Sequence, residues 1–104
     1  MFDRSTFSDD AWFGSTEFAD HTSFGAATFT CDARFGSATF AGRVGFDGVI
    51  FHRRAGFRGV TFSGDGWFGN TIFSGNTEFV GVRFTGNALF VSAKFAPAIR
   101  CLNA

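Results

Sequence analysis

The hydrophobic residues of this chain follow a single period of eleven residues. Phenylalanine recurs after six residues and then after five, as in residues 62–73, FSGDGWFGNTIF. All eighteen Phe residues obey this rhythm, at positions 2, 7, 13, 18, 24, 29, 35, 40, 46, 51, 57, 62, 68, 73, 79, 84, 90 and 95. From Ser5 to Ala93, the residue two positions before each Phe is small or β-branched. The residue directly before each Phe varies from unit to unit and can be polar, charged or apolar. Residues two apart face the same way in an extended chain, so each unit directs one small side chain and one Phe inward.

An extended solenoid explains this pattern better than a helix or a disordered chain does. Phe residues five apart would lie about 140° apart around an α-helix, which does not make a single apolar face. Each of the fourteen glycines would also cost about 1 kcal/mol in a helix interior. A disordered chain rich in Phe-Gly pairs has no physical reason to keep its Phe residues in phase. The sequence therefore predicts stacked coils of short extended segments.

Glycine is concentrated two residues after Phe, where we expect the coil to turn. The glycines at this position are Gly42, Gly48, Gly59, Gly64, Gly75, Gly81 and Gly86. We expect positive φ at these corners, because glycine adopts it with little steric cost. Every second unit has a sixth residue just before its small position, and we interpret these units as bulged corners. The additional residues are Asp10, His21, Asp32, Arg43, Arg54, Asp65, Asn76 and Asn87.

These tandem small-x-Phe-x-x units resemble the repeats of the pentapeptide-repeat family, from Phe2 to Phe95, although every second unit here has six residues. The resemblance implies an all-β fold, a right-handed quadrilateral β-helix with four sides per coil. Coils of four units would hold 22 residues each and number about four to five; a flat coil of 11 residues is the alternative. Charges that alternate in sign along residues 10, 21, 32 and 43, which are Asp10, His21, Asp32 and Arg43, slightly favour the flat coil. The packing of four Phe side chains from four sides favours the 22-residue coil.

We predict one solenoid domain at residues 1–95, followed by a short cap or tail at residues 96–104. Phe2 is in register directly after Met1, and Cys101 occupies the next Phe position, so the sequence predicts ends without polar caps. The predicted structural core consists of the Phe side chains of the inner repeats. These are Phe7, Phe13, Phe18, Phe24, Phe29, Phe35, Phe40, Phe46, Phe51, Phe57, Phe62, Phe68, Phe73, Phe79, Phe84 and Phe90.

The charged residues argue against a nucleic-acid or membrane partner. Nine Lys and Arg balance nine Asp and Glu, so the net charge is zero. Residues 1–33 are mainly acidic and residues 34–60 mainly basic. A basic group in the second segment could meet an acidic partner, but a solvated face is the simpler interpretation; it consists of Arg43, His52, Arg53, Arg54 and Arg58. The sequence contains no signal-peptide pattern and no apolar segment of membrane length, so we expect a cytoplasmic protein.

The sequence also lacks a convergent set of catalytic or metal-binding groups. The pairs His21 with Asp20 and Cys31 with Asp32 are adjacent in sequence, so their side chains should point to different faces of an extended segment. No metal-ligand spacing or nucleophile–base arrangement is present. We therefore expect a protein that is not an enzyme and that uses no cofactor and no metal.

Three functions remain open. The first is a protein-binding or scaffolding module that uses an apolar strip of outward residues, which we expect to stack in coils of 22 residues. The strip consists of Ile50, Trp67, Ile72, Leu89 and Val91. The second is a structural element that self-assembles by stacking its uncapped ends, as a homo-oligomer. The third is implied by the resemblance alone: some pentapeptide-repeat proteins are similar to B-form DNA in size and charge and bind type II topoisomerases. The zero net charge argues against that function.

Overall fold

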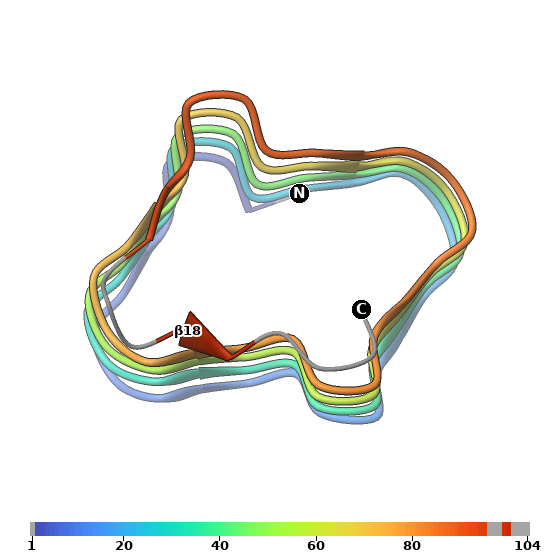
Figure 1. The fold of residues 1–104 in the computed structure, drawn as a ribbon. Helices are drawn as coiled ribbons and strands as arrows, with labels where there is room; N and C mark the ends of the chain where they lie inside the picture. The colour runs from blue at the N-terminus through green and yellow to red at the C-terminus, as the bar shows by residue number, and fades with distance from the viewer. Residues whose placement is uncertain (1, 96–98, 101–104) are drawn as a thin grey trace.

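The chain forms a four-sided β-solenoid of stacked coils (Figure 1), as seen in a computed structural model that describes residues 2–95 and 99–100. Each strand pairs in parallel with the strand 22 residues later, as Phe7 does with Phe29. The described residues contain strands and turns and no helix. The predicted all-β fold and the 22-residue coil are therefore confirmed, and the flat 11-residue coil is excluded.

The eighteen described strands have two residues each and form four parallel sheets, one for each side of the coil. Sheet A consists of β1 (Thr6–Phe7), β5 (Thr28–Phe29), β9 (Ile50–Phe51), β13 (Ile72–Phe73) and β17 (Lys94–Phe95). Sheet B consists of β2 (Ala11–Trp12), β6 (Ala33–Arg34), β10 (Ala55–Gly56), β14 (Thr77–Glu78) and β18 (Ile99–Arg100). Sheet C consists of β3 (Glu17–Phe18), β7 (Thr39–Phe40), β11 (Thr61–Phe62) and β15 (Arg83–Phe84). Sheet D consists of β4 (Thr22–Ser23), β8 (Val44–Gly45), β12 (Gly66–Trp67) and β16 (Ala88–Leu89). The chain passes through the sheets in the order A, B, C, D, so sheet D meets sheet A at a corner.

Columns of stacked Phe rings fill the interior of the solenoid. Successive rings of a column lie nearly parallel, as Phe24 and Phe46 do with centroids 5.0 Å apart and planes 2° apart. Rings of different columns meet edge to face, as Phe35 and Phe46 do at 5.6 Å and 90°. Both arrangements are favourable for aromatic pairs. The predicted Phe ladder is thus confirmed.

The Phe side chains in the middle of the solenoid are the most deeply buried. Those exposing 1% or less of their surface are Phe24, Phe29, Phe35, Phe40, Phe46, Phe51, Phe57, Phe62, Phe68 and Phe73. Phe79 is also buried, and other predicted core residues, Phe7, Phe13, Phe18, Phe84 and Phe90, are partly buried against this cluster. Small inward residues such as Ala33 and Val44 occupy the space between rings and are fully buried as well.

The corners are of two kinds, and only one kind has the expected positive φ. The five-residue units that follow sheets B and D turn through a residue with positive φ, which is Ser15 (56°) in one coil and Gly59 (67°) in another. The four glycines of the six-residue corners do not have positive φ, so that expectation was wrong; they are Gly42, Gly64, Gly75 and Gly86. A Cβ on any of these four would lie 2.5 to 2.8 Å from the coil beneath it. Glycine is favoured at these four positions because the backbones approach too closely for a Cβ unless the coils shift.

Strand pairing continues beyond residue 95, because β18 pairs with β14 and places Ile99 opposite Thr77. The remaining residues of the predicted tail, 96–98 and 101–104, lie outside the described residues, and the predicted core-like position of Cys101 lies there too. In the part of the chain that the structure describes, no helix is long and apolar enough to cross a membrane.

Candidate functional site

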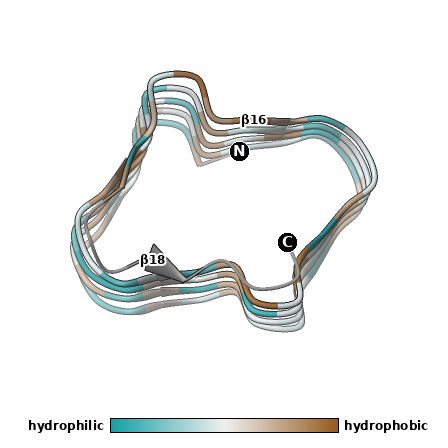
Figure 2. Ribbon diagram, in the orientation of Figure 1, coloured by the Kyte–Doolittle hydropathy of each residue, from teal (hydrophilic) through white to brown (hydrophobic). Residues whose placement is uncertain are grey.

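The structure brings the residues of the predicted apolar strip to two adjoining sides of the solenoid. Ile50 lies opposite Ile72 on sheet A, and Trp67 lies opposite Leu89 on sheet D. Val91 follows β16 at the corner between the two sheets, where Figure 2 shows hydrophobic residues on the last coil. Leu89 is 43% exposed and Val91 67% exposed, whereas the other three side chains are half-buried. The strip therefore occupies two adjoining sides of the solenoid, with Val91 at the corner between them.

A cation covers part of the Trp67 ring within this strip. The guanidinium carbon of Arg43, in the preceding coil, lies 5.1 Å from the ring centroid. Such a contact is attractive because the ring face is electron-rich. The indole Nε1 of Trp67 is buried and has no hydrogen-bond partner among the described residues. The strip thus combines an apolar surface with a positively charged edge.

Five aspartates connect successive coils through their carboxylates. Each accepts a hydrogen bond at 3.0 or 3.1 Å from the backbone N–H of the residue 22 positions later. The pairs are Asp3 with Gly25, Asp10 with Asp32, Asp32 with Arg54, Asp47 with Gly69, and Asp65 with Asn87. These amide groups lie at the corners, outside the strand pairing. The carboxylates give them the hydrogen-bond acceptors that backbone N–H groups need.

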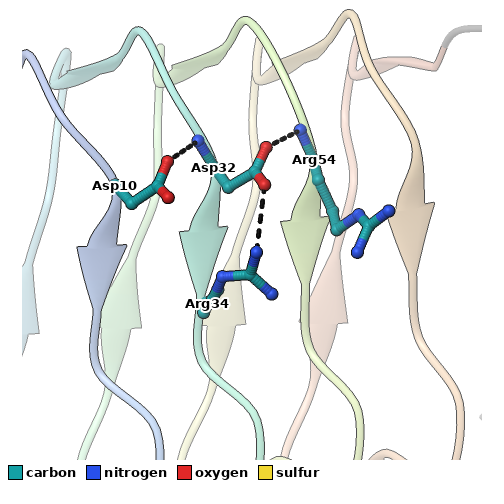
Figure 3. Close-up of polar contacts among 4 residues, drawn as sticks. All are labelled: Asp10, Asp32, Arg34 and Arg54. Atoms are coloured by element: carbon teal, nitrogen blue, oxygen red, sulfur yellow. Dashed lines mark hydrogen bonds and ion pairs between the residues drawn. The ribbon is translucent and has the colours of Figure 1, made fainter.

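This arrangement explains how two like charges stack at one corner, as Figure 3 shows. The carboxylate of Asp10 accepts the backbone N–H of Asp32, so a donor group lies between the two aspartates. Asp32 in turn accepts the backbone N–H of Arg54 at 3.1 Å and pairs with the guanidinium of Arg34 at 3.2 Å. The pattern of charges along the sequence did not predict these contacts. The feature of the sequence that could have predicted them is the recurrence of Asp at corner positions, 22 residues before a residue whose backbone N–H needs an acceptor.

Sheet B carries a pocket that we did not predict from the sequence. It has a volume of about 310 Å³. The residues that line it are Trp12, Gly14, Arg34, Gly36, Arg54, Gly56, Arg58 and Glu78. Gly56 lies between Arg34 and Glu78 in the register of β6, β10 and β14. The sequence feature that could have predicted the pocket is Gly56, an outward strand position without a side chain. The residues 22 positions before and after it, Arg34 and Glu78, have long side chains.

Arg34 is held at one wall of this pocket by two contacts. Its Nη2 lies 3.2 Å from Oδ2 of Asp32, and its guanidinium carbon lies 4.7 Å from the centroid of the Trp12 ring. Its Nε is buried without a hydrogen-bond partner among the described residues. Across those same residues, no three His, Cys, Asp or Glu side chains gather where they could hold a metal ion.

Comparison with known proteins agrees with this architecture. The chain matches the family model described as pentapeptide repeats (9 copies), over residues 2–50 and 46–94. No curated protein and no solved structure matches the chain. The two matched segments together span nearly all of the solenoid, and the chain therefore belongs to the pentapeptide-repeat family.

Proposed function

We propose that this solenoid is a non-enzymatic, protein-binding module that scaffolds a partner through the apolar strip. The observation that carries the proposal is the placement of two apolar columns on the two sides that flank one corner, Ile50 with Ile72 and Trp67 with Leu89. Apolar side chains grouped on neighbouring sides are more typical of an interface than of free protein surface. Trp and Arg are also the residues that most often dominate binding energy, and Arg43 lies over Trp67.

The solenoid presents this strip on a rigid support. Neighbouring strands of a sheet lie about 4.8 Å apart, so side chains 22 residues apart form columns with fixed spacing. A partner therefore meets a preorganised surface, and less conformational entropy is lost on binding. The exposed basic residues Arg43 and Lys94 border the strip, since Lys94 lies opposite Ile72. The partner that fits best is a protein with an apolar patch bordered by acidic side chains.

The distribution of acidic residues does not favour DNA mimicry. A mimic of DNA needs a continuous acidic surface, whereas five of the nine acidic residues here direct a carboxylate oxygen to a backbone amide at a corner. Basic side chains also lie among them, as Arg34 does beside Asp32. Protein binding through the apolar strip accounts better for this surface.

The proposal is tested with the double variant Trp67→Ser and Ile72→Ser. Both side chains point outward, so we expect the variant to keep the circular dichroism spectrum of the unchanged protein. We expect it to lose the proteins that the unchanged chain retains in quantitative affinity capture. If the partner is a second copy of the chain, the variant should also lose any rise of mass with concentration in light scattering.

The matched control is the double variant Thr61→Ser and Arg83→Ser. These residues are outward neighbours on sheet C, which lies opposite sheet A. The control should retain every partner that the unchanged protein retains. Equal retention by the strip variant, or equal loss from the control, would show that the strip is not the interface.

A further inference from the structure

The pocket on sheet B has a floor of glycines that the fold itself does not require. A Cβ added to Gly14, Gly36 or Gly56 would find its nearest neighbour at 3.4, 3.7 or 3.9 Å, which is ordinary van der Waals contact. None of the three has a positive φ. Of the three, Gly56 lies within a strand, β10. Glycine within a strand weakens the strand, and it commonly marks a place where a ligand approaches the backbone closely. These glycines therefore differ from Gly64, whose Cβ would overlap the coil beneath it.

Long charged side chains surround this floor on four sides. Arg54 and Arg58 lie two residues before and two residues after Gly56, so they are expected on the same outward side of the sheet. Arg34 and Glu78 occupy the register positions beside Gly56 in the two neighbouring strands. The open hollow has a volume of about 310 Å³, which lies at the lower end of the range for small-molecule sites. Its size therefore suits a small molecule.

The charges that line the pocket favour an anion. Three arginines against Glu78 give a lining charge of +2, and counting Asp32 beside Arg34 leaves +1. Among the described residues, Arg34 has a carboxylate within ion-pair distance, whereas Arg54 and Arg58 have none. Arginine binds carboxylate and phosphate groups with two parallel hydrogen bonds, so an oxyanion would satisfy the donors of Arg54 and Arg58.

A flat, apolar group suits the remainder of the pocket. Glycines leave the peptide planes of β10 and of the turn after β6 uncovered, and a ring can lie on such a surface. Trp12 is 71% exposed, and the guanidinium of Arg34 that stacks on it forms a planar wall. Guanidinium groups stack on aromatic rings as well as binding anions. We propose that this pocket binds a small aromatic oxyanion, with its phosphate or carboxylate between Arg54 and Arg58 and its ring over Gly36 and Gly56.

Isothermal titration of the full chain with three probes tests the proposal. Phenyl phosphate and benzoate carry the two anionic groups, and benzyl alcohol carries the same ring without a charge. We expect at least one anion to bind at least 10-fold more tightly than benzyl alcohol. The stronger of the two anions identifies the natural ligand as a phosphate ester or a carboxylate. The double variant Arg54→Gln and Arg58→Gln should weaken binding of that anion by 10-fold or more.

Gly56→Val provides the sharper test, because it fills the floor and leaves every charge in place. The added side chain has room at its Cβ, and valine is favoured in strands, so thermal stability should be unchanged or higher. Anion binding should be lost. The matched control is Gly45→Val on sheet D, where the nearest atom to an added Cβ lies 4.0 Å away. It should bind the anion as the unchanged protein does.

Three results would overturn the proposal. They are the absence of binding of both anions to the unchanged protein at millimolar concentration, equal binding of benzyl alcohol, and undiminished binding by Gly56→Val. Should Gly56→Val fail to fold, the arginine double variant decides the question, and an unchanged affinity in that variant would overturn the proposal.

Discussion

Replacing Gly64 with alanine tests whether the six-residue corners require glycine because the coils approach so closely. The added Cβ would lie 2.7 Å from the carbonyl carbon of Gly42, 2.8 Å from its oxygen and 2.9 Å from the nitrogen of Arg43. All three atoms belong to the backbone of the preceding coil. Strand pairing on both sides of the corner holds that backbone in place, so relief of the contact requires the coils to separate locally.

The expected loss of stability is large for the addition of one methyl group. The shortest contact falls 0.7 Å below the ordinary limit of 3.4 Å (3.4 − 2.7). Overpacking that forces backbone shifts costs about 1 to 3 kcal/mol, and we expect Gly64→Ala to lie near 3 kcal/mol because no flexible side chain can yield. For a domain of about 100 residues, each 1 kcal/mol lowers Tm by roughly 4 °C. The predicted decrease in Tm is therefore about 12 °C.

Two other glycines provide controls for the same substitution. Gly56→Ala places a Cβ 3.9 Å from its nearest neighbour at an ordinary φ, so it should stabilise the fold by about 0.5 to 1 kcal/mol. Gly59→Ala introduces a side chain at a φ of 67° and should cost about 1 kcal/mol. Thermal and urea unfolding, followed by circular dichroism, would rank the three variants. A Gly64→Ala protein as stable as Gly56→Ala would refute the close-approach argument.

Two further substitutions test the core and the corner hydrogen bonds by the same unfolding measurements. Phe46→Ala removes a fully buried ring that stacks 5.0 Å from both Phe24 and Phe68, and it should cost about 4 kcal/mol. Phe95→Ala, at a side chain that is 39% exposed, should cost less than half as much, and equal losses would contradict the described packing. Asp47→Ala removes the acceptor that lies 3.0 Å from the N–H of Gly69 and should cost about 1 kcal/mol. Asp47→Asn keeps an acceptor oxygen and should retain most of that stability; a variant as unstable as Asp47→Ala would show that the hydrogen bond is not the cause.

The sequence alone was sufficient to predict a β-solenoid and the direction of the side chains, whereas the strand register of the structure decided between the 22-residue and 11-residue coils. Residues two apart face the same way in an extended chain, so the phase of Phe separates inward from outward positions. Once four Phe side chains converge in each coil, residues 22 apart must stack, and this placed Ile50 beside Ile72 and Trp67 beside Leu89. These conclusions depend on repeat length and local alternation, both of which can be read directly from the chain.

Only the tertiary structure showed why glycine occurs at each kind of corner, and only it revealed the pocket. Gly64 and Gly59 occupy the same place in their repeat units, yet Gly64 lies against the coil beneath it and Gly59 has a positive φ. Likewise, the floor at Gly56 exists because Arg34 and Glu78 lie beside it in other coils. The register between coils also decides that the carboxylate of Asp32 accepts the backbone N–H of Arg54 and does not pair with the guanidinium of Arg54. Each of these features depends on distances of a few ångströms between coils, which repeat spacing does not determine.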